Sequence, residues 1–215
     1  HKVLTYPRTD SRFITSDIVE TLKDRVQACR TKDNASVVGK ILRNPIKGNK
    51  SFVDDQKVSD HHAIIPTEES VPLSAMTDKE RKIYGLVVNR FLAVLMPPFE
   101  YEQTTVKAKI KDETFIAKGK VVKAQGWKEV YDGASDEDET ADISDQRLPQ
   151  LNKGDSLKVV SLLQTKGETK PPAPFNEASL LSAMENPSNY MAGEDQSLIK
   201  TIGETGGLGT VATRA

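Results

Sequence analysis

Cysteine, histidine and long apolar runs are scarce in this chain of 215 residues. The single cysteine, Cys29, excludes an internal disulfide and indicates a reducing compartment such as the cytoplasm. Three histidines, one of them at position 1, give no closed zinc ligand set of the usual spacing. No apolar run approaches the length of a membrane span and no signal-peptide pattern opens the chain, so we expect neither membrane insertion nor secretion.

The glycine-rich segment 206–210 (GGLGT) also lacks what a nucleotide-binding loop needs. No Gly-Lys-Ser/Thr follows it, so it is not a P-loop and ATP binding is not expected. A flexible turn is the default interpretation, with phosphate contact through exposed backbone N–H groups as the alternative.

Charge is unevenly distributed along the chain. The formal net charge is −1, but residues 132–145 hold seven Asp or Glu and no Lys or Arg, so the remainder carries +6. Residues 1–50 hold eleven Lys or Arg against five Asp or Glu. A basic first quarter fits a polyanionic partner, although such charge is more often a solvated surface. We interpret the acidic run as a flexible loop without the spacing of metal ligands.

Periodicity predicts a helical first part. A helix capped by Thr15 or Ser16 is expected to carry Arg25 on a solvated face and an apolar face of Ile18, Leu22, Val26 and Cys29. Residues 31–60 are polar and rich in turn residues, which predicts a loop or short hairpin. Residues 77–80 (TDKE) form a capping-box sequence that opens a long helix ending near Leu95. Its apolar face is expected to contain Ile83, Val87, Val88, Phe91, Leu92 and Leu95.

The pattern changes after this helix. Strands are predicted at residues 104–110, 115–122, 126–131 and 157–160. Residues 170–174 (KPPAP) form a stiff connector, and Asn176 caps a short helix that ends before Pro187. The fold class is therefore α+β, with a helical part at 1–97, a β-rich part at 98–168 and a helical segment at 169–215.

Tyr6 and Arg8 are the first residues that could carry chemistry. Pro7 favours an extended Tyr6, and residues 6 and 8 of an extended segment point to the same side. Arg8 could then hold a phosphate that Tyr6 attacks, because a guanidinium matches phosphate oxygens. A tyrosine phenol is almost wholly protonated near neutral pH, so attack needs positive charge or a base. The commoner interpretation of this spacing is a Tyr-Pro turn with a surface arginine.

His61 and His62 form the second group. A histidine beside a phosphate can donate a hydrogen bond or act as acid or base. Adjacent side chains usually point in different directions, so at most one of the two is expected to face a given site. In isolation, one surface and one core histidine is the favoured interpretation.

Four segments resemble the type IA DNA topoisomerases, in the order that this family has them: residues 6–11 (YPRTDS), 60–67 (DHHAIIPT), 170–180 (KPPAPFNEASL) and 207–214 (GLGTVATR). The proline after Tyr6 and the doubled histidine are more similar to the topoisomerase III branch than to bacterial topoisomerase I. The resemblance runs from near residue 3 to the end. It implies a winged-helix-like catalytic domain joined to a β-rich arch, both part of a toroidal isomerase.

The resemblance also implies roles for individual residues. Tyr6 corresponds to the nucleophile, which forms a transient 5′-phosphotyrosine link to single-stranded DNA. Arg8 corresponds to the arginine that positions the scissile phosphate, and His61 to the histidine beside that phosphate. Further DNA contacts are implied for Thr9, Asp10, Ser11, His62 and Thr213.

The family binds Mg²⁺ in a Toprim domain, and no Asp-x-Asp cluster at a predicted strand end matches that site. We therefore interpret the chain as a fragment that lacks the Toprim and base domains and is inactive alone. The whole enzyme would relax or decatenate DNA without ATP, because exchanging one phosphodiester for another keeps the bond energy. A cytoplasmic, nucleoid-associated location follows.

Two other interpretations stay open on the sequence. A non-enzymatic winged-helix module would bind backbone phosphates without needing Tyr6. A fragment of a bacterial topoisomerase I, or of a reverse gyrase, would share the motifs. The sequence does not specify the preferred substrate of the parent, its organism or its oligomeric state.

Overall fold

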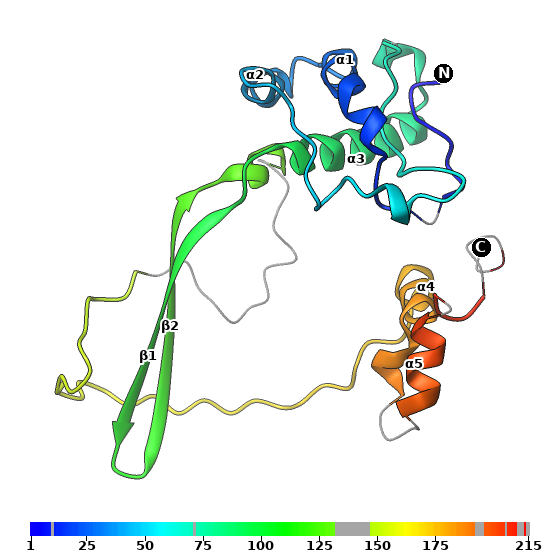
Figure 1. The fold of residues 1–215 in the computed structure, drawn as a ribbon. Coiled ribbons are helices and arrows are strands. Elements are labelled where there is room, and N and C mark those ends of the chain that lie inside the picture. Colours follow the sequence, from blue (N-terminus) through cyan, green and yellow to red (C-terminus); the bar gives the residue numbers. More distant parts are fainter. Residues whose placement is uncertain are drawn as a thin grey trace. The chain divides into compact units, whose positions relative to one another are not determined.

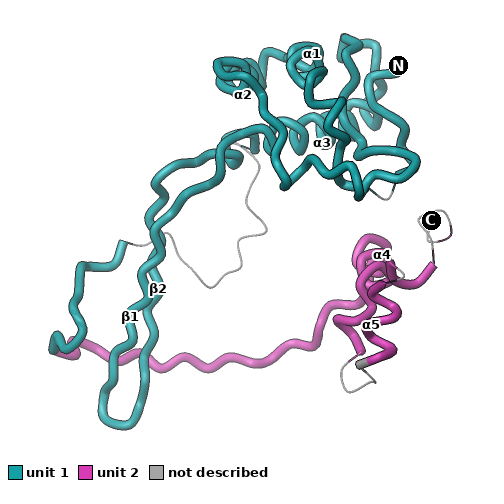
Figure 2. The backbone as a smooth tube through the Cα atoms, viewed as in Figure 1, with its two compact units in different colours: residues 1–156 teal, residues 157–215 magenta. Residues whose placement is uncertain are grey.

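The computed structural model describes residues 1–9, 11–70, 72–131, 147–191, 196–204, 206–209 and 213. The chain divides into two units, residues 1–156 and 157–215 (Figure 2). The described residues combine helices with one two-stranded antiparallel sheet, which confirms a mixture of helix and sheet. Asp10 and the acidic run 132–145 lie outside the described residues. None of the described helices is both long and apolar enough to cross a membrane.

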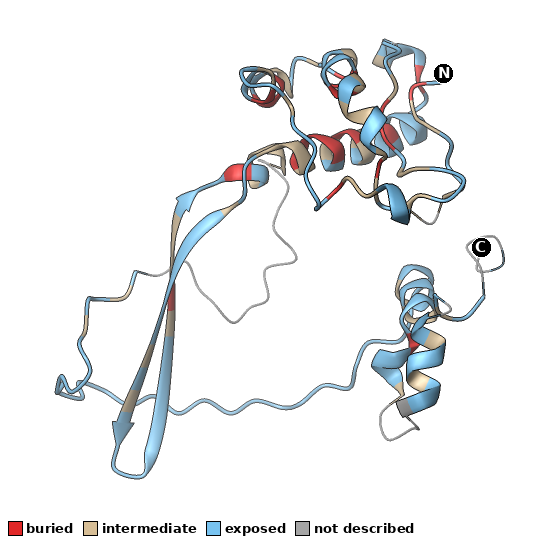
Figure 3. Ribbon diagram, viewed as in Figure 1, coloured by how far each residue is buried: buried red, intermediate tan, exposed pale blue. Residues whose placement is uncertain are grey.

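Three α-helices form the first part of unit 1 (Figure 1): α1 (Leu22–Ala28), α2 (Ala35–Leu42) and α3 (Asp78–Leu95). Short 3₁₀ turns accompany them at η1 (Ser16–Thr21), η2 (Asp55–Lys57) and η3 (Leu73–Ala75). The hydrophobic core lies among these helices and the segments that carry the first two sequence motifs (Figure 3). Its most buried side chains, each at most 1% exposed, include Leu22, Val26, Cys29, Val38 and Leu92.

The helix predicted to follow a cap at Thr15 or Ser16 is in fact two elements. Residues 16–21 form η1 and only then does α1 begin. Thr15 makes no side-chain cap at this end. Instead, the N–H of Ser16 donates to Oδ1 of Asp55 at 2.7 Å, so a residue from a distant turn satisfies this first-turn donor.

The prediction of a loop or hairpin across residues 31–60 is wrong where α2 forms. Val37, Val38 and Ile41 lie on one side of α2 and are buried in the core. Asn34 orders the turn before α2, because its side chain accepts the N–H of Thr31 at 2.7 Å and donates to the carbonyl of Cys29 at 3.0 Å. Burial of these three side chains stabilises a helix that local turn residues obscure.

α3 begins at the predicted capping box. The hydroxyl oxygen of Thr77 accepts the N–H of Glu80 at 3.3 Å, and the N–H of Thr77 donates to the Glu80 carboxylate at 2.8 Å. The apolar face is rotated slightly from the prediction: Ile83 is 59% exposed, whereas Tyr84 is buried. The buried face of α3 therefore begins at Tyr84 and continues at spacings of three or four residues through Val88, Phe91 and Leu92, and Ile83 lies outside it.

Removing this cap should cost measurable stability. We expect Thr77→Ala to lower the free energy of unfolding by about 1 kcal/mol, because one N–H of the first turn loses its acceptor. Thr77→Ser keeps the hydroxyl and is the matched control. Chemical denaturation followed by circular dichroism measures both, and equal stability of the two variants would show that the cap contributes nothing.

The burial of Cys29 predicts an unreactive thiol. Burial raises the pKa of this thiol from 9.0 to about 11, so at pH 8 the thiolate fraction falls from about one tenth to about one thousandth. The thiol pKa is higher in the folded state than in the unfolded state. The contribution of this shift to the free energy of unfolding is therefore fully present below pH 9 and is lost as the pH rises through 11. Iodoacetamide at pH 8 should therefore label Cys29 rapidly only in denaturant. Rapid labelling of the native chain would contradict this.

A β-hairpin follows α3, formed by β1 (Glu100–Ile110) and β2 (Glu113–Ala124). It confirms the strands predicted at 104–110 and 115–122. The strand predicted at 126–131 is wrong, because this segment is the 3₁₀ turn η4 (Gly126–Tyr131) packed on α3. Gly126 has a φ of +50°, and a Cβ there would lie 2.1 Å from the carbonyl oxygen of Pro98. The N–H of Trp127 donates to the carbonyl of Pro97 at 2.9 Å, which joins the start of η4 to the segment between α3 and β1.

Unit 2 begins without regular structure. The strand predicted at 157–160 is wrong: these residues form no strand, and the exposed fraction of Val160 is 92%. The connector at 170–174 is exposed and has no regular secondary structure. α4 (Glu177–Glu185) starts at the predicted Asn176 cap, and η5 (Pro187–Tyr190) and α5 (Gln196–Glu204) follow.

The glycine-rich segment is a defined turn on α4. The φ angles of Gly206, Gly207 and Gly209 are all positive. The N–H of Leu208 donates to the carbonyl of Met184 at 2.7 Å. A Cβ on Gly207 would lie 2.3 Å from that same carbonyl oxygen, so only glycine fits this close approach.

Candidate active site

Backbone hydrogen bonds join the two conspicuous motifs of unit 1. Leu4 and Pro66 form an antiparallel bridge. On either side of it, the N–H of Thr5 donates to the carbonyl of Ile65, and the N–H of Thr67 donates to the carbonyl of Val3, both at 3.0 Å. Residues 3–5 and 65–67 therefore lie side by side. Tyr6 directly follows the first segment and His61 lies four residues before the second, so the pairing brings both into the same neighbourhood.

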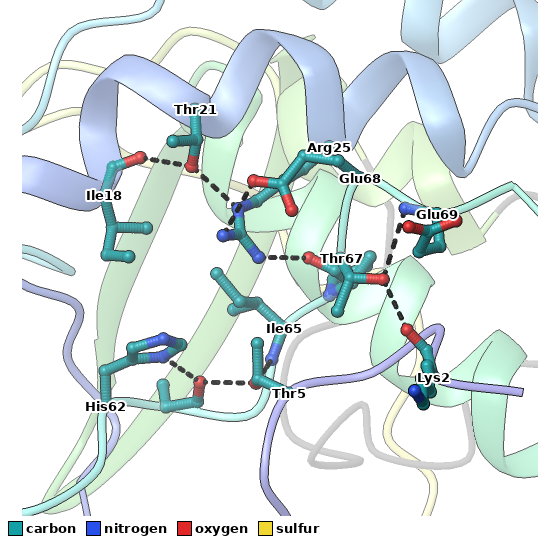
Figure 4. Close-up of polar contacts among 12 residues, drawn as sticks. Lys2, Thr5, Ile18, Thr21, Arg25, His62, Ile65, Thr67, Glu68 and Glu69 are labelled. Carbon is teal, nitrogen blue, oxygen red and sulfur yellow. Dashed lines mark hydrogen bonds and ion pairs between the residues drawn. The ribbon is translucent and has the colours of Figure 1, made fainter.

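Two further contacts fix this register. The hydroxyl of Thr5 accepts the N–H of Ile65 at 3.0 Å and donates to the carbonyl of Ala63 at 3.3 Å (Figure 4). The N–H of Ala63 donates to the carbonyl of Phe13 at 2.8 Å. The histidine motif is thus held between the segments before and after Tyr6.

Tyr6 and His61 meet at the open end of this arrangement. Their ring centroids lie 4.4 Å apart with an interplanar angle of 40°. Tyr6 is 54% exposed and His61 is also exposed, so both rings contact each other while remaining accessible from solvent. A phenol and an imidazole in direct contact at the surface could act together on one phosphate.

The hydroxyl groups of Thr9 and Ser11 both form hydrogen bonds to other residues of the chain. Thr9 donates to the carbonyl of His61 at 2.8 Å and accepts the N–H of Ser11 at 3.1 Å. Ser11 donates to the carbonyl of Lys57 at 2.7 Å. Thr9 thus holds the backbone of His61 directly.

His62 has a different contact from His61. It is half-buried, and its Nδ1 lies 2.7 Å from the carbonyl oxygen of Ala63 (Figure 4). The pKa of Asp17 lies below its ordinary value, chiefly because Thr15 donates a hydrogen bond to the carboxylate, with a smaller contribution from His62. The two adjacent histidines therefore have different surroundings, as predicted.

The remaining candidate residues are placed less closely. Arg8 is exposed, and no ion pair holds it among the residues that the structure describes. Thr213 is exposed and belongs to unit 2, whereas Tyr6 and His61 belong to unit 1. Asp10 lies outside the described residues.

Arg25 is a functional candidate that the sequence analysis missed, and its predicted solvated position is wrong. It is 7% exposed. Its guanidinium donates to the carbonyl of Pro66 at 2.9 Å and to the hydroxyl of Thr21 at 2.7 Å, and it pairs with Glu68 at 2.9 Å (Figure 4). Arg25 therefore links α1 to Pro66. Pro66 in turn pairs with Leu4, which lies two positions before Tyr6.

A groove of about 440 Å³ lies beside these motifs. Thr9, Ser11 and Ala63 line one part of it and residues of α3 line another, including the exposed Leu86 and Arg90. Among the described residues, no group of three or more His, Cys, Asp or Glu is placed to hold a metal ion.

Comparisons with known proteins agree with the motifs. The family model described as DNA topoisomerase matches residues 1–215. The chain is 65% identical to DNA topoisomerase 3 of Bacillus licheniformis and 63% identical to that of Bacillus subtilis, each over all 215 residues. It is 62% identical to DNA topoisomerase 3 of Bacillus thuringiensis over 216 aligned positions. The chain spans 29–30% of the length of these relatives.

Proposed function

Because the chain belongs to the DNA topoisomerase family, we propose that Tyr6 is the nucleophile that breaks and rejoins one DNA strand in a topoisomerase III. The observation that carries this proposal is the contact between the rings of Tyr6 and His61, at 4.4 Å, from two motifs distant in sequence. Relatives named DNA topoisomerase 3, at 62–65% identity, favour this branch over bacterial topoisomerase I and over a non-enzymatic module.

The proposed step exchanges one phosphodiester for another. The phenol oxygen of Tyr6 forms a bond to the phosphorus of the scissile phosphate, and the bond from phosphorus to O3′ breaks. The phenol gives up its proton and the O3′ leaving group takes one up, which leaves a 5′-phosphotyrosine and a free 3′-hydroxyl. Religation reverses these changes, so relaxation or decatenation of DNA consumes no ATP.

Each neighbouring residue has a proposed part in this step. His61 donates a hydrogen bond to the phosphate or moves the proton, since its ring contacts Tyr6. Arg8 binds the phosphate oxygens with its exposed guanidinium. Thr9 and Ser11 position the backbone around His61. For the other motif residues we propose contacts to the bound single strand: Asp10, His62 and Thr213.

The wider architecture is also a proposal. Residues 1–97 would form the winged-helix-like catalytic domain, residues 98–168 the β-rich arch and residues 169–215 the start of the helical base of a toroid. Mg²⁺ would be held by a Toprim domain, for which the described residues offer no cluster of ligands. The chain alone would bind DNA weakly without cleaving it, and the whole enzyme would act on the cytoplasmic nucleoid.

Mapping the covalent link tests the proposal. A full-length protein containing this chain is incubated with single-stranded DNA and Mg²⁺, denatured, and digested with nuclease and trypsin. We expect the residual nucleotide mass on the peptide of residues 3–8 (VLTYPR), at Tyr6. A nucleotide on any other peptide, or none on a protein that still relaxes DNA, would overturn the assignment.

A further inference from the structure

The two faces of the β1–β2 hairpin differ in charge. Residues paired directly across an antiparallel sheet point to the same side, and alternate residues point to opposite sides. The register therefore defines one face, here named the lysine face, which consists of Tyr101, Gln103, Thr105, Lys107 and Lys109 of β1 and Thr114, Ile116, Lys118, Lys120 and Val122 of β2. It holds four lysines and no Asp or Glu.

The opposite face lacks this excess of positive charge. It contains Glu102, Glu113 and Lys123, whose ammonium group pairs with the Glu102 carboxylate at 2.9 Å, and otherwise apolar or small residues apart from Thr104. Residues 147–151 lie against this face near Gly119 and Val121, where they line a common groove. Residues 147–151 therefore cover part of the opposite face.

Apolar and aromatic groups interrupt the lysines. Tyr101 is 48% exposed and Ile116 is 59% exposed, although both lie among charged neighbours. The ammonium group of Lys120 lies 5.8 Å from the ring centroid of Tyr101. The ring centroid of Phe99 lies 5.3 Å from that of Tyr101, with an interplanar angle of 34°, so the tyrosine ring packs against a second ring. An exposed, supported ring beside a lysine is a surface on which a base can stack.

We propose that the lysine face binds single-stranded nucleic acid, with phosphates on the lysines and a base on Tyr101. Lys107 and Lys109, and likewise Lys118 and Lys120, are two residues apart, which gives a repeat of about 7 Å along each strand. A row of cations beside an aromatic ring is the arrangement that binds single strands without sequence preference. The identification of the bound nucleic acid as DNA rests on the proposed function. The charge of the lysine face and the exposed ring of Tyr101 do not depend on that function.

Salt dependence of binding tests the four lysines. Lys107, Lys109, Lys118 and Lys120 are replaced together by glutamine, and binding of a long single-stranded oligonucleotide to the whole chain is measured by fluorescence anisotropy at several salt concentrations. Each lost phosphate contact should lower the slope of log affinity against log salt by about 0.7, and affinity at low salt should fall about tenfold or more. An unchanged slope would overturn the proposal.

Three controls separate this surface from simpler explanations. A second variant replaces four exposed lysines elsewhere with glutamine, and so makes the same change in net charge: Lys23, Lys32, Lys79 and Lys82. If this variant lost as much affinity for the oligonucleotide, net charge would explain the effect and the proposal would be overturned. Tyr101→Ala should weaken single-strand binding about tenfold and duplex binding little, whereas Tyr101→Phe should do neither. Equal losses on both substrates would overturn the claim for single strands.

The same samples distinguish failure of this proposal from failure of the proposed function. Tyr6→Phe should bind the oligonucleotide like the unaltered chain. If the lysine variants bind normally while the full-length protein still forms an adduct at Tyr6, only the lysine face is excluded. If no adduct forms but the lysine variants lose binding, the surface stands and the catalytic assignment of Tyr6 fails.

Discussion

Replacing Tyr6 with phenylalanine is expected to abolish covalent adducts and DNA relaxation by a full-length protein that contains this chain. The loss should be at least about a thousandfold, because phenylalanine removes the attacking oxygen and no other group can take its place in the bond to phosphorus. The ring contact with His61 should persist, since it joins the two aromatic rings and does not need the hydroxyl. DNA binding should therefore remain within about twofold, as measured by anisotropy.

Tyr190→Phe is the matched control for this prediction. Tyr190 is also exposed, at 62%, and its ring also contacts another aromatic ring, that of Phe175, at 5.5 Å. Its substitution should leave relaxation unchanged. Adducts that persist in Tyr6→Phe would assign the link to a different residue. Absence of adducts from the unaltered protein, with DNA binding retained, would instead support a non-enzymatic DNA-binding module.

Local signals in the sequence were sufficient for some elements. The capping box at Thr77 and Glu80 and the cap at Asn176 involve residues three apart, so the sequence itself contains both partners. The strand at 104–110 shows its alternation directly. α2 was missed because its helical pattern is short: Val37, Val38 and Ile41 favour a helix only once the core they contact exists. The turn at 126–131 depends on Pro97, which accepts the N–H of Trp127.

The candidate site divides in the same way. Tyr6 and His61 could be singled out from sequence because their motifs resemble a family, but their contact depends on the pairing of Leu4 with Pro66. Arg25 could not be found, because an arginine on a helix next to apolar positions is usually solvated. Its burial follows from an acceptor 41 residues later in the chain, the carbonyl of Pro66.

Replacing Arg25 with methionine is expected to destabilise the chain and to disturb the Tyr6–His61 contact. Methionine fills a similar volume, so the main loss is polar: the buried carbonyl of Pro66 loses its donor and Glu68 loses its partner. We expect a decrease of about 3 kcal/mol in the free energy of unfolding. Because Pro66 pairs with Leu4, the loosened segment should also weaken the ring-to-ring nuclear Overhauser effect between Tyr6 and His61 in the folded fraction.

Two substitutions show whether this effect comes from the bond to Pro66 or from charge alone. Glu68→Gln removes only the ion pair, whose carboxylate side chain is 46% exposed, and should cost less than about 1 kcal/mol. Arg25→Lys keeps the charge but cannot donate to Pro66, Thr21 and Glu68 from one planar group, so it should resemble methionine more than arginine. A lysine variant with full stability and an intact ring contact would show that charge suffices. The guanidinium would then have no special part in holding the histidine motif beside Tyr6.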